Sequence, residues 1–215
     1  MGSVPRATVH LYFVPDERTG AAAVVGGRGH IGLNAGALAL LGENAMEREV
    51  LRQLAVLHAL RQGDLPSPQT LVTRLYLEGL GAWSVRAIRP RTLEAEVVGS
   101  TPATLSAAQG KVRDVGARIA GALGSTDAAV ADELLIHGNG DPSLAVAGRL
   151  AAYSLVRALA RDDLPSQVLG MGFATFNQRA ATYWNPAAGA SAAAGGALVE
   201  ERSEAEVKAL DDVLV

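Results

Sequence analysis

The spacing of apolar residues changes along the chain and divides it into a β-rich beginning and a long helical remainder. Residues 8–14 (TVHLYFV), 21–25 and 29–34 are short apolar runs separated by turn-forming residues, a pattern typical of strands. From residue 46 onward, apolar residues recur every three or four positions, which is the spacing of amphipathic helices. The pattern therefore predicts an α+β fold, with a small mixed N-terminal β-sheet packed on a mainly helical body.

Two long helices open the helical part, over residues 46–62 and 69–88. The break between them is short and rich in glycine and proline, so we expect the two helices to run antiparallel. Asp141 followed by Pro142 is typical of a helix start, with an N-cap and then proline at the first helical position. The further helices that we predict cover residues 105–123, 127–137, 141–161 and 165–179.

The C-terminal part of the chain differs in composition from the rest. Residues 187–202 are dominated by alanine, glycine and serine in their first part and are interpreted as a linker. Ser203 and Glu206 have the spacing of a capping box and predict a last short helix. We therefore expect a domain at 1–186, a linker at 187–202 and a short helical segment at 203–215.

Composition excludes several classes of protein. Hydrophobic residues make up 49% of the 215 positions and charged residues 19%, which is typical of a folded domain with a core. Cysteine is absent, which excludes disulfides, thiolate zinc sites and a cysteine nucleophile. The formal net charge of −3 argues against nucleic acid as the main partner.

The apolar runs are too short for a membrane span, which needs roughly 18 or more consecutive apolar residues. The first ten residues lack the apolar stretch of a secretory signal. We therefore expect a cytoplasmic protein, or a secreted one if a leader has been removed, without a membrane partner. The oligomeric state is left open.

A glycine-rich stretch at residues 27–32 matches G-x-G-x-x-G letter by letter. Dinucleotide binding would require a helix directly after this motif and an acidic residue about 20 positions further on, at the end of a strand. A long helix with no strand behind it follows instead. The stretch is therefore interpreted as a glycine-rich hairpin or edge strand, and no cofactor is expected.

His58 and Glu78 are the most notable polar residues of the two predicted helices. His58 follows Leu54 by one helical turn and is predicted to lie on the inward face of its helix, and Glu78 stands in the apolar stretch YLEGL. A buried, ionised carboxylate costs several kcal/mol unless a partner is present. Two antiparallel helices could bring His58 and Glu78 together, either as a structural hydrogen-bonded pair or as an acid–base pair.

The segments around these residues resemble the gluzincin-type predicted zinc-dependent proteases (the DUF2268 and peptidase-MA-like groups). The resemblance is carried by the helix that ends in LAVLHAL and by Glu78-Gly79-Leu80-Gly81 with a serine at position 84. It implies a zincin-like fold in which a His-Glu-x-x-His helix and a later glutamate bind zinc. The stretch around Tyr153 resembles a later helix of that family, and Tyr153, or alternatively Tyr76, could then donate a hydrogen bond in the site.

The motif is degenerate in this chain. If His58 is the second histidine, Leu54 replaces the first and Ala55 replaces the glutamate that activates water. We therefore expect no metal site, and a cleft reused for small-molecule binding or for metal-free acid–base chemistry by His58, Glu78 and Tyr153. Two alternatives stay open: an active zinc peptidase with non-standard ligands, and a purely structural or interaction module.

Overall fold

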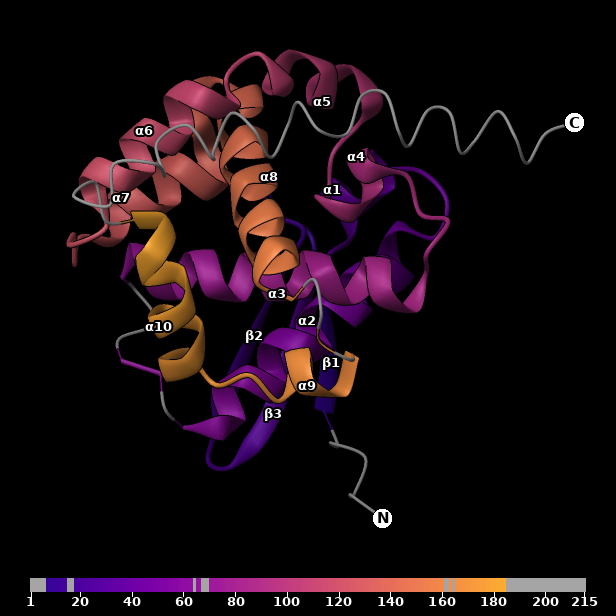
Figure 1. The fold of residues 1–215 in the computed structure, drawn as a ribbon. Helices are drawn as coiled ribbons and strands as arrows, with labels where there is room; N and C mark the ends of the chain where they lie inside the picture. Colours follow the sequence, from indigo (N-terminus) through magenta and orange to yellow (C-terminus); the bar gives the residue numbers. More distant parts are fainter. Residues whose placement is uncertain are drawn as a thin grey trace, which may run out of the picture.

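A computed structural model describes residues 7–14, 18–63, 65–66, 70–160, 163 and 165–184, and it has the predicted α+β architecture (Figure 1). Three strands come first and helices make up the remainder. The predicted linker at 187–202 and the segment at 203–215 lie outside the described residues. Among the described residues, no helix combines the length and the apolar character needed to cross a membrane.

The sheet contains β1 (Ala7–Tyr12), β2 (Gly20–Val25) and β3 (Arg28–Asn34), in the order β1-β3-β2. It is mixed, as predicted, because β1 is parallel and β2 antiparallel to the central β3. β2 and β3 are joined by a tight turn in which Gly26 and Gly27 have φ values of 56° and 75°. Such turns need positive φ at both central residues, which glycine adopts without strain. The glycine-rich stretch is therefore part of a hairpin, one of its two interpretations; the other, an edge strand, is wrong, because β3 is the central strand.

One face of the sheet is covered by α2 (Ala45–Gln62), and the short α1 (Ala35–Ala39) connects β3 to it. Side chains on this face of β3, Ile31 and Leu33, are fully buried together with Leu57 of α2. α2 ends at Gly63 with φ 75°, the left-handed conformation that commonly terminates helices. The alternation of buried residues in β3 and the glycine stop together position α2 across the sheet.

α3 (Leu71–Ile88) packs on α2, and α8 (Pro142–Leu159) packs on α3 on the side away from the sheet (Figure 1). The α2–α3 pair confirms the two long helices predicted from the sequence. α3 begins at Thr70, whose hydroxyl accepts a hydrogen bond from the Thr73 amide at 3.4 Å. α8 begins at Asp141 with proline at the first helical position, as predicted.

Two predicted helices are divided in the structure. Residues 105–123 form α5 and α6, interrupted at Gly110 and Lys111, and residues 165–179 form α9 and the beginning of α10, interrupted at 170–172. Glycine weakens a helix, and both interruptions contain it. The remaining elements are α4 (Glu94–Val97), α5 (Pro102–Gln109), α6 (Val112–Ala122), α7 (Ala128–Asp132), the π-helix η1 (Glu133–His137), the 3₁₀ turn η2 (Gly138–Gly140), α9 (Pro165–Leu169) and α10 (Phe173–Trp184).

A group of aromatic side chains fills the space between α3, α9 and α10. We call Tyr76, Phe173 and Phe176 the aromatic cluster. The Tyr76 ring lies 4.9 Å from the Phe176 ring and 5.9 Å from the Phe173 ring, between ring centroids. All three are buried, and the Tyr76 hydroxyl donates to the Met171 carbonyl. This cluster fixes one side of α3 and leaves another side of the helix to face a pocket.

Candidate functional site

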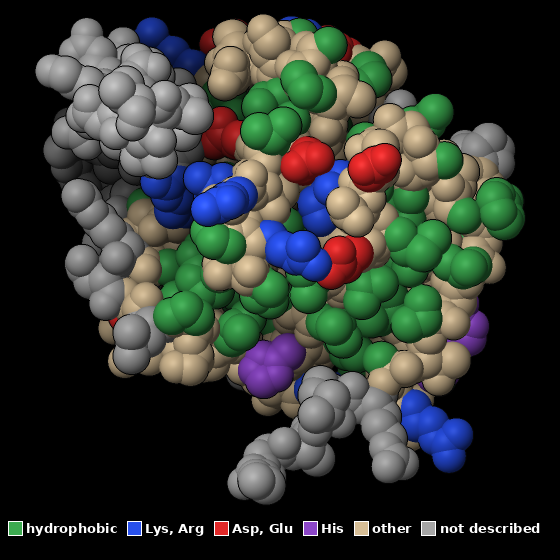
Figure 2. Space-filling view, turned by 90° about the vertical axis from the view of Figure 1, so that its right-hand side faces the viewer, with side chains coloured by type: hydrophobic (Ala, Val, Ile, Leu, Met, Phe, Trp, Pro, Cys, Tyr) green, Lys and Arg blue, Asp and Glu red, His purple; other side chains and the backbone are tan. Residues whose placement is uncertain are grey.

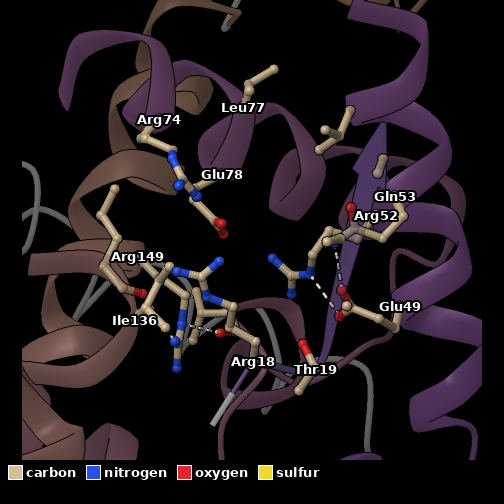
Figure 3. A pocket seen from close by; sticks show the side chains of 17 residues that line it. Arg18, Thr19, Glu49, Arg52, Gln53, Arg74, Leu77, Glu78, Ile136 and Arg149 are labelled. Carbon is tan, nitrogen blue, oxygen red and sulfur yellow. Dashed lines mark hydrogen bonds and ion pairs between the residues drawn. The ribbon is translucent and has the colours of Figure 1, made fainter. Parts of the chain in front are cut away.

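A pocket of about 120 Å³ lies where the residues before β2 meet α2, α3 and α8. We call it the arginine pocket, because four arginines line it. Figure 3 shows the charged side chains of α2 and α3 approaching this space from opposite sides. The charged residues that line it are Arg18, Glu49, Arg52, Arg74, Glu78 and Arg149.

α2 contributes a buried polar network to the pocket wall. The Glu49 carboxylate accepts a hydrogen bond from Gln53 Nε2 at 2.7 Å and forms an ion pair with Arg52 Nε at 3.3 Å. The Arg52 guanidinium also donates to the Val97 carbonyl. Glu49, Arg52 and Gln53 are all less than a tenth exposed. Buried charges need such partners, because an unpaired charge in a protein interior is strongly destabilising.

Small residues on neighbouring elements make room for this network. A Cβ atom at Gly81 of α3 would lie 2.6 Å from Arg52 Cγ, and one at Gly20 of β2 would lie 2.7 Å from Glu49 Oε1. Carbon atoms do not approach other heavy atoms so closely without a shift of the structure. The glycines therefore allow α2 to carry large charged side chains into the space between the sheet and α3.

The other arginines are held from the opposite side of the pocket. Arg18 and Arg74 both contact Asp132 Oδ1, at 3.0 Å and 3.4 Å. Arg149 donates from Nε to the Val98 carbonyl at 3.0 Å and from a terminal nitrogen to the Leu135 carbonyl at 3.1 Å. These two bonds orient the Arg149 guanidinium at the wall of the pocket.

Glu78 is half-buried, and its carboxylate points into the arginine pocket (Figure 3). Within the described residues it forms no direct ion pair or hydrogen bond. The lining has four arginines and two glutamates, and Asp132 contacts two of the arginines from behind.

The structure places His58 away from Glu78. The prediction that His58 lies on the inward face of α2 is wrong: its side chain is exposed, with Nε2 3.2 Å from Gln62 Nε2. Val56 lines the arginine pocket, and a residue two positions later lies about 200° further around a helix. In the part of the chain that the structure describes, the expected His58–Glu78 pair is therefore not formed.

Tyr153 also lies apart from the pocket. It is 2% exposed and belongs to the core cluster that α3 and α8 form with the elements between them, from α4 to η1. Two other histidines, His10 and His30, stack on the sheet face opposite α2, with ring nitrogens 3.1 Å apart. Among the described residues, no group of three or more His, Cys, Asp or Glu side chains could hold a metal ion.

Sequence reasoning missed most of this site. Glu49, Arg52, Gln53 and Val56 have the i, i+3, i+4, i+7 spacing of one helix face, but their polarity makes that face look exposed. A usable signal was the isolated charge within apolar helices: Arg149 of α8 stands between apolar and small residues in AVAGRLAA. A charged residue in such a context either pairs or faces a cavity.

Comparisons of this chain with models of known protein families, with curated proteins and with solved structures find no match. The function of the site is therefore argued from its own geometry and charge.

Proposed function

We propose that this chain binds a small organic anion in the arginine pocket. The observation that carries the proposal is the convergence of Arg18, Arg52, Arg74 and Arg149 from four separate segments on one open pocket. Guanidinium groups suit carboxylates and phosphates, because their donors are planar and match paired oxygens. Four guanidinium groups at one pocket favour an anion over a neutral molecule or a cation.

Rigid placement supports a binding role. Arg52 is held by Glu49 and by a backbone carbonyl, and Arg149 is held by two carbonyls. Side chains that are already ordered lose little conformational freedom when a ligand binds. Glu78 limits the affinity for anions and would accept a hydrogen bond from a hydroxyl or ammonium group on the same ligand.

The resemblance to gluzincin-type peptidases can be kept if the His-Glu-x-x-His motif is aligned with residues 52–56 of α2 instead of 54–58. In such a scaffold the ligand helix and the later glutamate face the same space. The α2 residues that share the pocket with Glu78 are Glu49, Arg52, Gln53 and Val56, not Leu54 and His58. Arg52 and Val56 would then stand in place of the two histidines, and Gln53 in place of the glutamate. We infer a degenerate peptidase scaffold in which the Glu49–Arg52 network replaces the metal.

A titration of the isotope-labelled protein with propionate tests the binding role. NMR signals of the arginine Nε–H groups monitor the titration. Propionate should produce saturable shifts at the pocket arginines, and propylammonium, which is similar in size but cationic, should not. Arg74→Gln should weaken propionate binding, because it removes one positive charge from the wall.

Glu78→Gln should change the affinity for propionate in the opposite direction to Arg74→Gln, which makes the test sharper. This variant keeps the shape of the side chain and removes a negative charge, so propionate should bind several-fold more tightly. Glu43→Gln is the matched control, since Glu43 is exposed and does not line the pocket. Absence of saturable shifts would overturn the proposal, and so would equal effects of Glu78→Gln and Glu43→Gln on propionate binding.

A further inference from the structure

Two histidines lie side by side on the face of the sheet opposite α2. Ile31 and Leu33 of β3 point toward α2, so the residues that alternate with them point the opposite way. His30 of β3 is on this outer face. His10 of β1 shares it, because β1 is parallel to β3 and His10 is registered with Gly32. Neither histidine lines the arginine pocket, so the pair is a separate feature of the molecule.

The way in which side chains lean along β1 brings the two rings together. His30 is registered with Thr8, two residues before His10, so the His10 ring reaches it along the strand direction. Tyr12 leans the same way. A Cβ atom at Gly32 would lie 3.0 Å from Tyr12 Cε1, although the residue registered with Gly32 is His10. The outer side chains of β1 therefore lean toward the start of the strand, which positions His10 beside His30.

The geometry of the pair matches two ligands of one metal ion. His10 Nε2 and His30 Nδ1 are 3.1 Å apart, and the rings stack with 5.4 Å between centroids and an interplanar angle of 20°. Imidazole nitrogens bind zinc at about 2.0–2.1 Å, so two of them at about 90–110° on one ion are about 2.9–3.4 Å apart. The observed distance falls within this range. Rotation of the rings about their soft χ2 torsions is therefore enough to direct both lone pairs at one ion.

The surroundings leave the pair accessible. His10 is exposed and His30 half-buried, and Ala21 and Ala23 of β2, which share the outer face, are exposed. Such small neighbours leave room above the sheet for an ion and its remaining ligands. Arg28 also shares this face, two residues before His30, but it is exposed to water, which screens its charge. Figure 2 shows histidine side chains at the molecular surface, apart from the charged side chains that gather in the middle of the view.

We propose that His10 and His30 chelate a late first-row divalent metal ion of the class Ni²⁺, Cu²⁺ and Zn²⁺. Imidazole suits these ions, whereas Mg²⁺ and Ca²⁺ prefer oxygen ligands. Among the described residues, no third His, Cys, Asp or Glu side chain joins the pair. The other positions of the ion are therefore filled by water or by donor groups of another molecule.

The hydrogen bond between the rings explains how the site opens. Without metal, one neutral imidazole donates an N–H···N hydrogen bond to the other, between His10 Nε2 and His30 Nδ1. When the ion binds, the proton of the donating ring moves to its other ring nitrogen, so that both facing nitrogens present lone pairs to the metal. Two neutral rings release no proton in this step. The inference does not depend on anion binding in the arginine pocket.

Calorimetric titration of the full chain, prepared without a histidine tag, tests the site. Ni²⁺ should bind with one equivalent per chain, and an excess of Mg²⁺ should not displace it. His10→Gln and His30→Gln should each weaken Ni²⁺ binding by about 100-fold, because the second metal bond is intramolecular once the first has formed. His58→Gln is the matched control, since His58 is exposed on α2 and is not part of the pair, and it should leave the affinity unchanged.

Nitrogen-15 NMR of the histidine rings gives a readout that locates the ion, with diamagnetic Zn²⁺ as the probe. Zn²⁺ should shift His10 Nε2 and His30 Nδ1 and leave the protons on His10 Nδ1 and His30 Nε2. Circular dichroism of each variant separates a loss of binding from a loss of fold.

Several results would overturn the inference. A pair that serves only as a hydrogen-bonded stack would show no saturable Ni²⁺ binding. Unchanged affinity in His10→Gln or His30→Gln would show that the two rings do not act together, and an equal loss in His58→Gln would show binding by scattered histidines. Zn²⁺ on the opposite ring nitrogens would contradict the geometry. Half an equivalent per chain would mean an ion shared between two copies, which contradicts a site on one chain.

Discussion

α3 has two contrasting environments on one helix. On one side Tyr76, a member of the aromatic cluster, and Leu80 are buried among neighbouring apolar side chains. On another side Arg74 and Glu78 face the arginine pocket, together with other charged side chains. Apolar burial stabilises the fold without preference for any ligand, whereas a half-buried charge is retained at some cost in stability. The difference indicates that the first side holds the helix in place and the second serves binding.

The largest effect is expected in the aromatic cluster. Phe176 is fully buried, so Phe176→Ala should lower the free energy of unfolding by about 3–5 kcal/mol, measured by denaturant titration. Phe176→Leu keeps most of the volume and should cost less. Propionate binding by the folded variant should not change; a loss of binding in proportion to the loss of stability would contradict the separation of the two sides.

A slightly smaller loss of stability is expected from substitutions in the Glu49–Arg52 network of α2. The loss on replacing Arg52 should depend on whether Glu49 is present. Arg52→Met leaves the buried Glu49 carboxylate without its ion pair and should cost about 3 kcal/mol. Replacing Glu49 as well, by Met, removes the isolated charge, so the double variant should be more stable than Arg52→Met alone. A double-mutant cycle measures this coupling. Additive costs would show that the two side chains do not depend on each other.

α8 packs on α3 and contributes Arg149 to the arginine pocket. The stability of its first turn depends on pH. Hydrogen bonds from the Lys111 ammonium and the Ser143 hydroxyl lower the pKa of the Asp141 carboxyl to about 2. Because the folded-state pKa lies below the unfolded value of 3.8, the ionised form stabilises the fold above pH 4, and this contribution is lost as the pH falls toward 2.

Asp141→Asn should therefore remove part of the stability at neutral pH and flatten its decrease in acid, as measured by thermal unfolding between pH 2 and about 6. Lys111→Met should raise the pKa of Asp141, followed by NMR of its carboxyl carbon, since it removes the main donor. An unchanged titration in Lys111→Met would show that the Lys111–Asp141 contact does not persist in solution.

The smallest effect on stability is expected at Glu78. Glu78→Gln keeps the shape of a half-buried side chain that has no direct ion pair among the described residues, so the free energy of unfolding should change by less than about 0.5 kcal/mol, or rise. Binding of propionate should change instead. A large loss of stability would mean that Glu78 is part of the structural framework, as Tyr76 is.

The secondary structure of this chain follows largely from its sequence. The apolar runs at 21–25 and 29–34 and the glycine-rich stretch at 27–32 indicate a hairpin, because strand period and positive φ are local properties. The 3–4 spacing in 46–62 predicts α2, and Asp141 with Pro142 predicts the start of α8. The interruptions at Gly110 and Lys111 and at 170–172 were not predicted, since glycine weakens a helix, as expected for Gly170 and Gly172, without determining where the helix ends.

Only the tertiary structure decided which face of each helix meets which neighbour. The sequence singled out Glu78 in an apolar stretch, and the structure places Glu78 at a pocket. The sequence could not identify the charged residues that share the pocket with Glu78. Glu49 and Arg52 are buried only because Gly20 of β2 and Gly81 of α3 allow close approach. His58 resembled an inward residue because it follows Leu54 by one turn, yet α2 turns that position toward solvent. A helical period determines which residues share a face, and the packing of distant elements determines what that face contacts.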